Sequence, residues 1–238
     1  MAADSVATIR NTFSHEIEGY IDNIQKIYKI SKTNFGVSYW GLGGVEGKSV
    51  LEFLTDFEKS VSATDTLDQV AQKLTSRLST TLPTNQYRMG LHIAGYVTDG
   101  DTSIPQLRHI FHEAWHKPGQ FVCENCNKES LAKDVRIEFY SPANYLALFN
   151  GDNTVANCLF NYIPAMTQNQ HRIQPESLTI EECLELAEMV VGIAIQRLQY
   201  YVDTEYRKVP QTVGGKVIIA KITSTNGFEW VKNEIGAQ

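Results

Sequence analysis

Apolar residues recur at helical spacing in three segments of the chain, and each such segment predicts an amphipathic helix. The first begins where Ser49 and Glu52 have the spacing of a capping box. Its expected inward face comprises Val50, Leu51, Leu54, Phe57 and Val61. The second begins at Thr66 and Gln69, and its expected inward face comprises Leu67, Val70, Leu74 and Leu78. Each helix has a single apolar side, so each must pack against a sheet or against the other helix.

The longest helical pattern begins at Thr179, which has capping-box spacing to Glu182. The residues expected to face inward are Ile180, Leu184, Ala187, Val191, Ile195, Leu198 and Val202. The opposite side carries Glu181, Glu185, Glu188, Gln196 and Gln199. Acidic residues at the start of this helix and basic residues toward its end agree with the direction of the helix dipole.

Alternating apolar and polar residues predict strands between and after these helices. Residues 89–97 alternate before a turn at 98–101, and residues 135–139 alternate again. Residues 216–222 are strand-like, Asn226–Gly227 favours a tight type I′ hairpin turn, and residues 228–231 form the returning strand. No repeat or linker divides the sequence. We therefore expect one domain over residues 1–238, of the α+β class with mostly antiparallel strands.

The composition excludes several classes of protein. Hydrophobic residues make up 42% of the 238 residues, which excludes a disordered chain. The net charge of −6 argues against nucleic acid or an anionic membrane as a partner. The longest apolar run, residues 189–195, is far shorter than the roughly 20 residues of a membrane span, and no secretion signal opens the chain. We therefore expect a cytoplasmic protein.

The cysteines are too few and too scattered for a disulfide scaffold. Cys158 and Cys183 lie in apolar helical patterns, so we expect both to be small buried residues. Cys123 and Cys126 are the other two cysteines. The alternative for them is a zinc site, because His112, His116, Cys123 and Cys126 have the spacing H-x3-H-x6-C-x2-C. Residues 107–111 are strand-like, however, and a strand places successive side chains on alternate faces. We therefore expect a loop with two incidental thiols, and no metal or cofactor.

Four segments, taken in order, carry a family resemblance. Residues 1–8 read MAADSVAT, residues 26–30 read KIYKI, residues 35–43 read FGVSYWGLG, and residues 213–217 read VGGKV. Together with the strand at 93–96, they resemble the proteasome β-subunit branch of the N-terminal-nucleophile hydrolases. The resemblance covers most of the chain. It implies a four-layer αββα sandwich, with two antiparallel sheets between helix layers, often assembled into rings.

The resemblance also implies a set of catalytic residues. In this family the first mature Thr, Ser or Cys is the nucleophile, and its α-amine, with an unperturbed pKa of about 8, is the base. By motif position Lys26 would lower the proton affinity of that amine, and Asp4 would hold the lysine in place. The backbone N–H of Gly41 would be the oxyanion donor. The alternative interpretation makes Asp4 a turn or cap residue and Lys26 a charge at a strand edge.

The chain departs from the family pattern at several positions. Only Met1 precedes the Ala-Ala-Asp motif, so the nucleophile is absent from the printed sequence. Val213 stands where the family has serine, Pro210 where an acidic residue is expected, and Val6 where the family has arginine. The alternative is that Met1 is an internal methionine and that the nucleophile is encoded upstream.

We therefore expect a proteasome-subunit-like protein without catalytic activity, a pseudoenzyme that acts as an assembly or binding subunit in a homo-oligomer or ring. The first alternative is an N-terminal-nucleophile peptidase or amidohydrolase whose start lies upstream and whose substrate is a peptide or protein. The second alternative is a ligand-binding domain of the same architecture that is not an enzyme, because fold does not fix function. The residue at the mature N-terminus discriminates the first two.

Overall fold

The computed structural model describes residues 1–10, 17–82, 89–112, 121–124, 155, 158–159, 166, 173, 177–198 and 213–235. In these residues the α+β class with antiparallel strand pairing is confirmed. The chain forms two compact units. The first comprises Met1–Gln25, Asn144–Ile219 and Val231–Gln238, and the second comprises Lys26–Ala143 and Ala220–Trp230.

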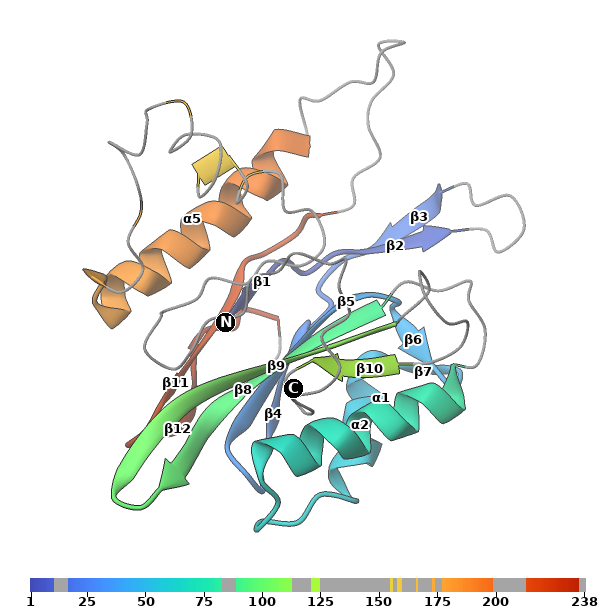
Figure 1. Cartoon of the computed structure of the whole chain (residues 1–238). Helices are drawn as coiled ribbons and strands as arrows, with labels where there is room; N and C mark the ends of the chain where they lie inside the picture. The colour runs from blue at the N-terminus through green and yellow to red at the C-terminus, as the bar shows by residue number, and fades with distance from the viewer. Residues whose placement is uncertain are drawn as a thin grey trace. The chain divides into compact units, whose positions relative to one another are not determined.

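The second unit is built on a five-stranded antiparallel sheet of order β10-β9-β8-β5-β4. Its strands are β4 (Ile27–Ile30), β5 (Phe35–Gly41), β8 (Met89–Asp99), β9 (Thr102–His112) and β10 (Phe121–Glu124). The strands β8 and β9 form a long hairpin that is visible in Figure 1. The pair Asp99↔Thr102 closes the hairpin at the turn expected from the sequence, and residues 107–111 are strand as expected.

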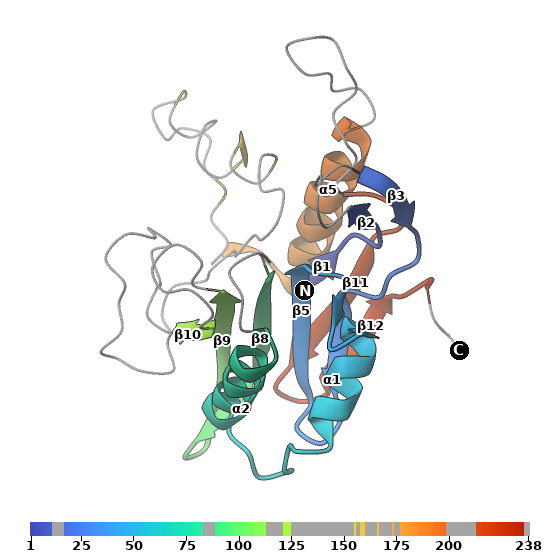
Figure 2. The ribbon, with the colours of Figure 1, turned by 90° about the vertical axis from the view of Figure 1, so that its right-hand side faces the viewer.

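Two helices cover one face of this sheet, as Figure 2 shows. The helix α1 (Val50–Glu58) contacts β4, and α2 (Leu67–Thr81) contacts β8, β9 and β10. Both predicted capping boxes are present, at Ser49 with Glu52 and at Thr66 with Gln69. The predicted inward face of α2 is fully buried, and Phe53 of α1, which the sequence analysis left out, is fully buried as well. Two short strands, β6 (Gly44–Val45) and β7 (Lys48–Ser49), pair with each other before α1.

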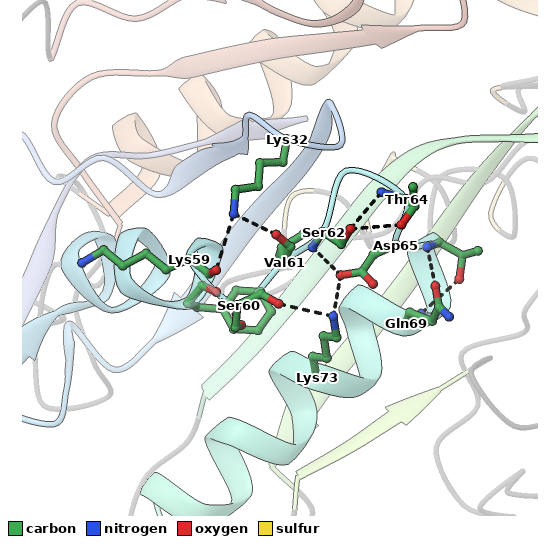
Figure 3. Close-up of polar contacts among 11 residues, drawn as sticks. Lys32, Lys59, Ser60, Val61, Ser62, Thr64, Asp65, Gln69 and Lys73 are labelled. Atoms are coloured by element: carbon green, nitrogen blue, oxygen red, sulfur yellow. Dashed lines mark hydrogen bonds and ion pairs between the residues drawn. The ribbon is translucent and has the colours of Figure 1, made fainter.

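Two lysines hold the connection between α1 and α2 (Figure 3). Lys32 Nζ donates to the carbonyl oxygen of Val61 at 2.9 Å. Lys73 Nζ, from α2, donates to the carbonyl oxygen of Ser60 at 3.3 Å and pairs with the Asp65 carboxylate at 2.6 Å. The last carbonyls of a helix have no partner within the helix. The two ammonium groups therefore satisfy carbonyl groups just beyond the end of α1 and fix the turn into α2.

The first unit contains the chain's N-terminal strands. These are β1 (Ala2–Ala3), β2 (Ala7–Arg10) and β3 (Ile17–Ile21). The strand β1 pairs with β11 (Ile218–Thr223) in the register Ala2↔Ile219, and the three-stranded sheet has the order β1-β11-β12. The strands β2 and β3 form a separate two-stranded ribbon.

The C-terminal hairpin expected from the sequence is present, with β12 covering Gly227–Lys232. The turn occupies residues 224–226, however, and Gly227 already belongs to β12. The expected two-residue turn at Asn226–Gly227 is therefore wrong. Gly227 still needs to be glycine, because its φ is +66° and an added Cβ would lie 2.9 Å from Cβ of Asn34.

The long helix α5 spans Ile180–Leu198, and its capping hydrogen bonds between Thr179 and Glu182 are present. Its buried face agrees with the expected one at Ile195 and differs from it elsewhere. Val190 and Ala194 pack against Val155, whereas Ile180, expected to face inward, is 50% exposed. The apolar residues of α5 occupy more than one side of the helix, so spacing alone does not select the face that contacts the rest of the unit.

Two expectations about cysteine burial are wrong. Cys158 and Cys183 are both exposed free thiols. Both lie in apolar stretches, but Cys183 occupies the first turn of α5, where its neighbours Glu181 and Glu182 are also exposed. An apolar local pattern therefore does not bury a residue at the exposed start of a helix.

Residues 135–139, Val202 and Pro210 lie outside the described residues. Within the described part of the chain, no helix combines the length and apolarity needed to cross a membrane.

Candidate functional site

Asp4 lies between β1 and β2 in the first unit, and its carboxylate holds two backbone amides. Its Oδ2 accepts from the N–H of Val6 at 3.2 Å and from the N–H of Gly214 at 3.0 Å. The bond to Val6 is the local turn that aspartate forms with the residue two positions on. The bond to Gly214 joins segments 210 residues apart. Asp4 therefore fixes the N-terminal segment to the segment that precedes β11.

Ser5 extends this connection with three further hydrogen bonds. Its N–H donates to the carbonyl oxygen of Gly214 at 3.0 Å, and its carbonyl accepts from the N–H of Ile24 at 2.8 Å. Its hydroxyl oxygen accepts from the N–H of Lys216 at 2.7 Å. Ser5 is fully buried, so these bonds satisfy polar groups that burial would otherwise leave unpaired.

Gly215 allows the two segments to approach this closely. Its φ is +71°, and an added Cβ would lie under 3.0 Å from the Ser5 hydroxyl oxygen, closer than real Cβ atoms lie to a neighbour. Glycine is thus required at this position both for its backbone conformation and for its lack of a side chain. We call Asp4, Ser5, Gly214, Gly215 and Lys216 the clasp. Of the five residues in the clasp, Asp4 alone was expected to be a site residue from the sequence, and the Gly-Gly pair at 214–215 entered only as part of the family resemblance.

The clasp consists of one carboxylate, one hydroxyl and the backbone groups that they bind. A carboxylate that accepts two N–H groups is held in one orientation, because charge-assisted hydrogen bonds are stronger than neutral ones. The observed bonds give Asp4 and Ser5 a definite structural role. This role agrees with the alternative interpretation of Asp4 as a turn residue, and it leaves the catalytic interpretation a prediction.

Lys26 lies in the second unit, one residue before β4. Its carbonyl oxygen accepts from the N–H of Tyr39 at 3.1 Å, so the pairing of β4 with β5 continues to residue 26. In the described part of the sheet β4 is the last strand, and lysine is common on such edge strands. This position agrees with the interpretation of Lys26 as an edge charge. It does not test the catalytic role that the resemblance implies.

Gly41 ends β5 in the second unit, in register with Met89 of β8. Its φ is +91°, a conformation that residues with a Cβ rarely adopt, and it is exposed. Glycine is therefore required at this turn for its backbone conformation. An exposed strand end without a side chain lets another chain approach closely. The proposed oxyanion role of its N–H remains a prediction.

The zinc candidate lies largely outside the described residues. His116 and Cys126 are not described, and His112 and Cys123 are placed only as backbone positions, on β9 and β10 respectively. Among the side chains that the structure describes, no three His, Cys, Asp or Glu residues converge on a point where a metal ion could bind. The zinc site stays a prediction.

A shallow hollow of about 490 Å³ lies on the second unit, next to the lysine contacts of Figure 3. It is lined by Ser60, Gln69, Gln72, Lys73 and Ser76. The Lys73 ammonium already pairs with Asp65, so its charge is neutralised within the protein. The hollow therefore offers hydroxyl and amide groups to a ligand.

No family model matches the chain, and no curated protein matches it. Function is therefore inferred from the residues of this chain and from the resemblance of its short motifs.

Proposed function

We propose that this chain is a proteasome-subunit-like protein that serves in assembly or binding rather than in peptide hydrolysis. In this proposal the five-stranded sheet with α1 and α2 forms one half of an αββα sandwich. The sheet β1-β11-β12 with α5 forms the other half. The support is the layering within each unit: two helices on one sheet, and α5 in contact with β1.

The observation that carries the proposal is the hydrogen bonding of the clasp. Asp4 and Ser5, the polar residues of the Ala-Ala-Asp-Ser motif, bind backbone N–H groups of Gly214 and Lys216. Gly214 is buried, so loss of the Asp4 carboxylate leaves the Gly214 N–H unsatisfied, which costs about 1–3 kcal/mol. We therefore expect Asp4 to contribute to the stability of the fold.

The test compares Asp4→Ala with Asp101→Ala in the full chain. Asp101 is an exposed carboxylate in the turn between β8 and β9, so it controls for the loss of one negative charge. We expect Asp4→Ala to lower the unfolding midpoint and Asp101→Ala to leave it nearly unchanged. We also expect wild-type protein to form a defined oligomer by light scattering and to leave peptide amides uncleaved. Hydrolysis of a peptide amide that Asp4→Ala abolishes at unchanged stability would contradict the proposal.

The second candidate function is amide hydrolysis by an N-terminal nucleophile. It is favoured by Gly41, whose positive φ and exposure at the end of β5 suit a backbone N–H that faces a substrate. N-terminal sequencing of the native protein, with an electrophilic peptide as a probe, tests this function. A Thr, Ser or Cys at the mature N-terminus that the probe labels covalently would support it. An unlabelled protein without such a residue would exclude it.

A further inference from the structure

Two histidines face each other on neighbouring strands of the five-stranded sheet. His92 of β8 and His109 of β9 are register partners, with exposures of 8% and 5%. Their ring centroids are 4.9 Å apart, and the ring planes are tilted by 59°. In the described sheet both strands have neighbours on each side. Solvent therefore screens a charge at this pair only weakly.

The histidine pair belongs to a row of positions that crosses the sheet. Ser38 of β5 is the register partner of His92, and Glu124 of β10 is the register partner of His109. Successive residues of a strand alternate between the faces, so Ile93, next to His92, belongs to the opposite face. Among the described positions of this row, Glu124 is the one acidic residue.

The charged groups on the opposite face are paired within the second unit. The helix α2 packs there, and Arg108 of β9 forms an ion pair with Asp68 of α2. Lys73 of α2 pairs with Asp65. Arg77 of α2 lies 3.6 Å from the Glu46 carboxylate, with its guanidinium above the ring of Phe53. These groups lie on the far side of the sheet from the histidine row.

We propose that His92, packed against His109, is an acid-sensitive latch, which holds the five-stranded sheet closed while its imidazole is neutral and opens the β8–β9 ladder when it binds a proton. A protonated imidazole here is a buried charge, which is strongly unfavourable. The neighbouring His109 ring, 4.9 Å away, also disfavours a positive charge on His92. The latch therefore responds to acid through burial and through the proximity of the rings.

The direction of the pH effect follows from the pKa of His92. Burial, and then the neighbouring His109, lower this pKa from 6.5 to about 3. In the unfolded chain the same imidazole titrates near 6.5, so above that pH it is neutral in both states and the folding equilibrium is unaffected. Below about pH 6.5 the unfolded state binds a proton that the folded state does not. The folding constant then falls about tenfold per pH unit from His92 alone, until about pH 3.

The test measures unfolding of the full chain by urea between pH 7.5 and 4.5, with amide hydrogen exchange in β8 and β9 to isolate this sheet. The variants are His92→Gln and, as a matched control, Ile93→Val, which loses one methyl group from a fully buried neighbour. Relative to His92→Gln, we expect the wild-type folding constant to fall about tenfold per pH unit below 6.5. Ile93→Val should be less stable at every pH and keep the wild-type slope. Equal slopes in wild type and His92→Gln would overturn the proposal.

A direct titration keeps the proposal testable if His92→Gln fails to fold. Wild-type protein labelled with carbon-13 in its imidazole rings is followed by nuclear magnetic resonance over the same pH range. We expect the His92 signal to remain that of a neutral ring for as long as the protein stays folded. A His92 signal that titrates with a midpoint near 6.5 in the folded protein would overturn the latch.

Discussion

Gly215→Ala is the substitution that best tests the clasp. The glycine has a φ of +71°, and the added methyl group would meet the Ser5 hydroxyl oxygen, with Cγ2 of Val6 at 3.2 Å on another side. The methyl group fits only if the Ser5 hydroxyl moves away. That movement would break its hydrogen bond to the N–H of Lys216.

Two terms make up the expected loss of stability. An alanine in the left-handed region costs about 1–2 kcal/mol. The Ser5 hydroxyl is buried, and leaving it without its hydrogen-bond partner costs about 1–3 kcal/mol. We therefore expect Gly215→Ala to lower the free energy of unfolding by about 2–5 kcal/mol, of which the second term belongs to the clasp.

Gly47→Ala is the matched control. Gly47 has a φ of +72°, and an added Cβ would meet nothing within 4 Å, so this variant carries the backbone term alone. Thermal unfolding gives the overall effect. Hydrogen exchange at the Lys216 amide reports on the clasp itself. We expect faster exchange there in Gly215→Ala and wild-type exchange in Gly47→Ala.

The double variant Ser5→Ala/Gly215→Ala completes the cycle. Without the Ser5 hydroxyl the new methyl group has space on that side, so the effect of Gly215→Ala should shrink toward the backbone term of about 1–2 kcal/mol. The reasoning is refuted if Gly215→Ala and Gly47→Ala destabilise equally, or if the two substitutions in the first unit prove additive.

Four further predictions concern the second unit and α5. Thr66→Ala removes the capping box of α2 and should cost about 1 kcal/mol in thermal unfolding. Burial and then the hydrogen bond to a carboxylate raise the pKa of Tyr28 to about 12. Its phenolate absorbance should therefore appear near pH 12, and stability should fall between pH 10 and 12 as the unfolded chain loses that proton first. Gly90→Ala should destabilise the five-stranded sheet and shift Trp40 fluorescence, because the added methyl group would overlap the indole ring. At Gly192 an added Cβ would meet nothing within 4 Å, so Gly192→Ala should stabilise α5 by about 0.5–1 kcal/mol.

The helices of the second unit were predictable because their signals are local. A capping box and a 3.6-residue apolar period lie within each helix, and together they place α1 and α2 and most of their buried residues. The burial of Phe53 was missed because the spacing rule selected a narrower face than the one that the helix buries. The β8–β9 hairpin was also local, because its strands are joined by a short turn containing Gly100.

The clasp and the face of α5 depend on contacts between distant parts of the chain. Nothing near Asp4 in the sequence indicates that its carboxylate binds Gly214, 210 residues away. Val190 and Ala194 are buried because Val155 lies against them, whereas the spacing pattern favoured Ile180. Long-range partners such as these are fixed by tertiary structure, which single-sequence periodicity does not encode.

The pairing of β1 with β11 has a consequence for biosynthesis. Ala2 has its partner at Ile219, and the second unit also includes residues 220–230, so each unit takes segments from both early and late parts of the chain. A ribosome delivers the N-terminal residues first, and long-range contacts of this kind form slowly. The emerging polypeptide therefore leaves β1 unpaired until residues 218–219 have been synthesised, and during that time the edge of this strand is open to pairing with another chain.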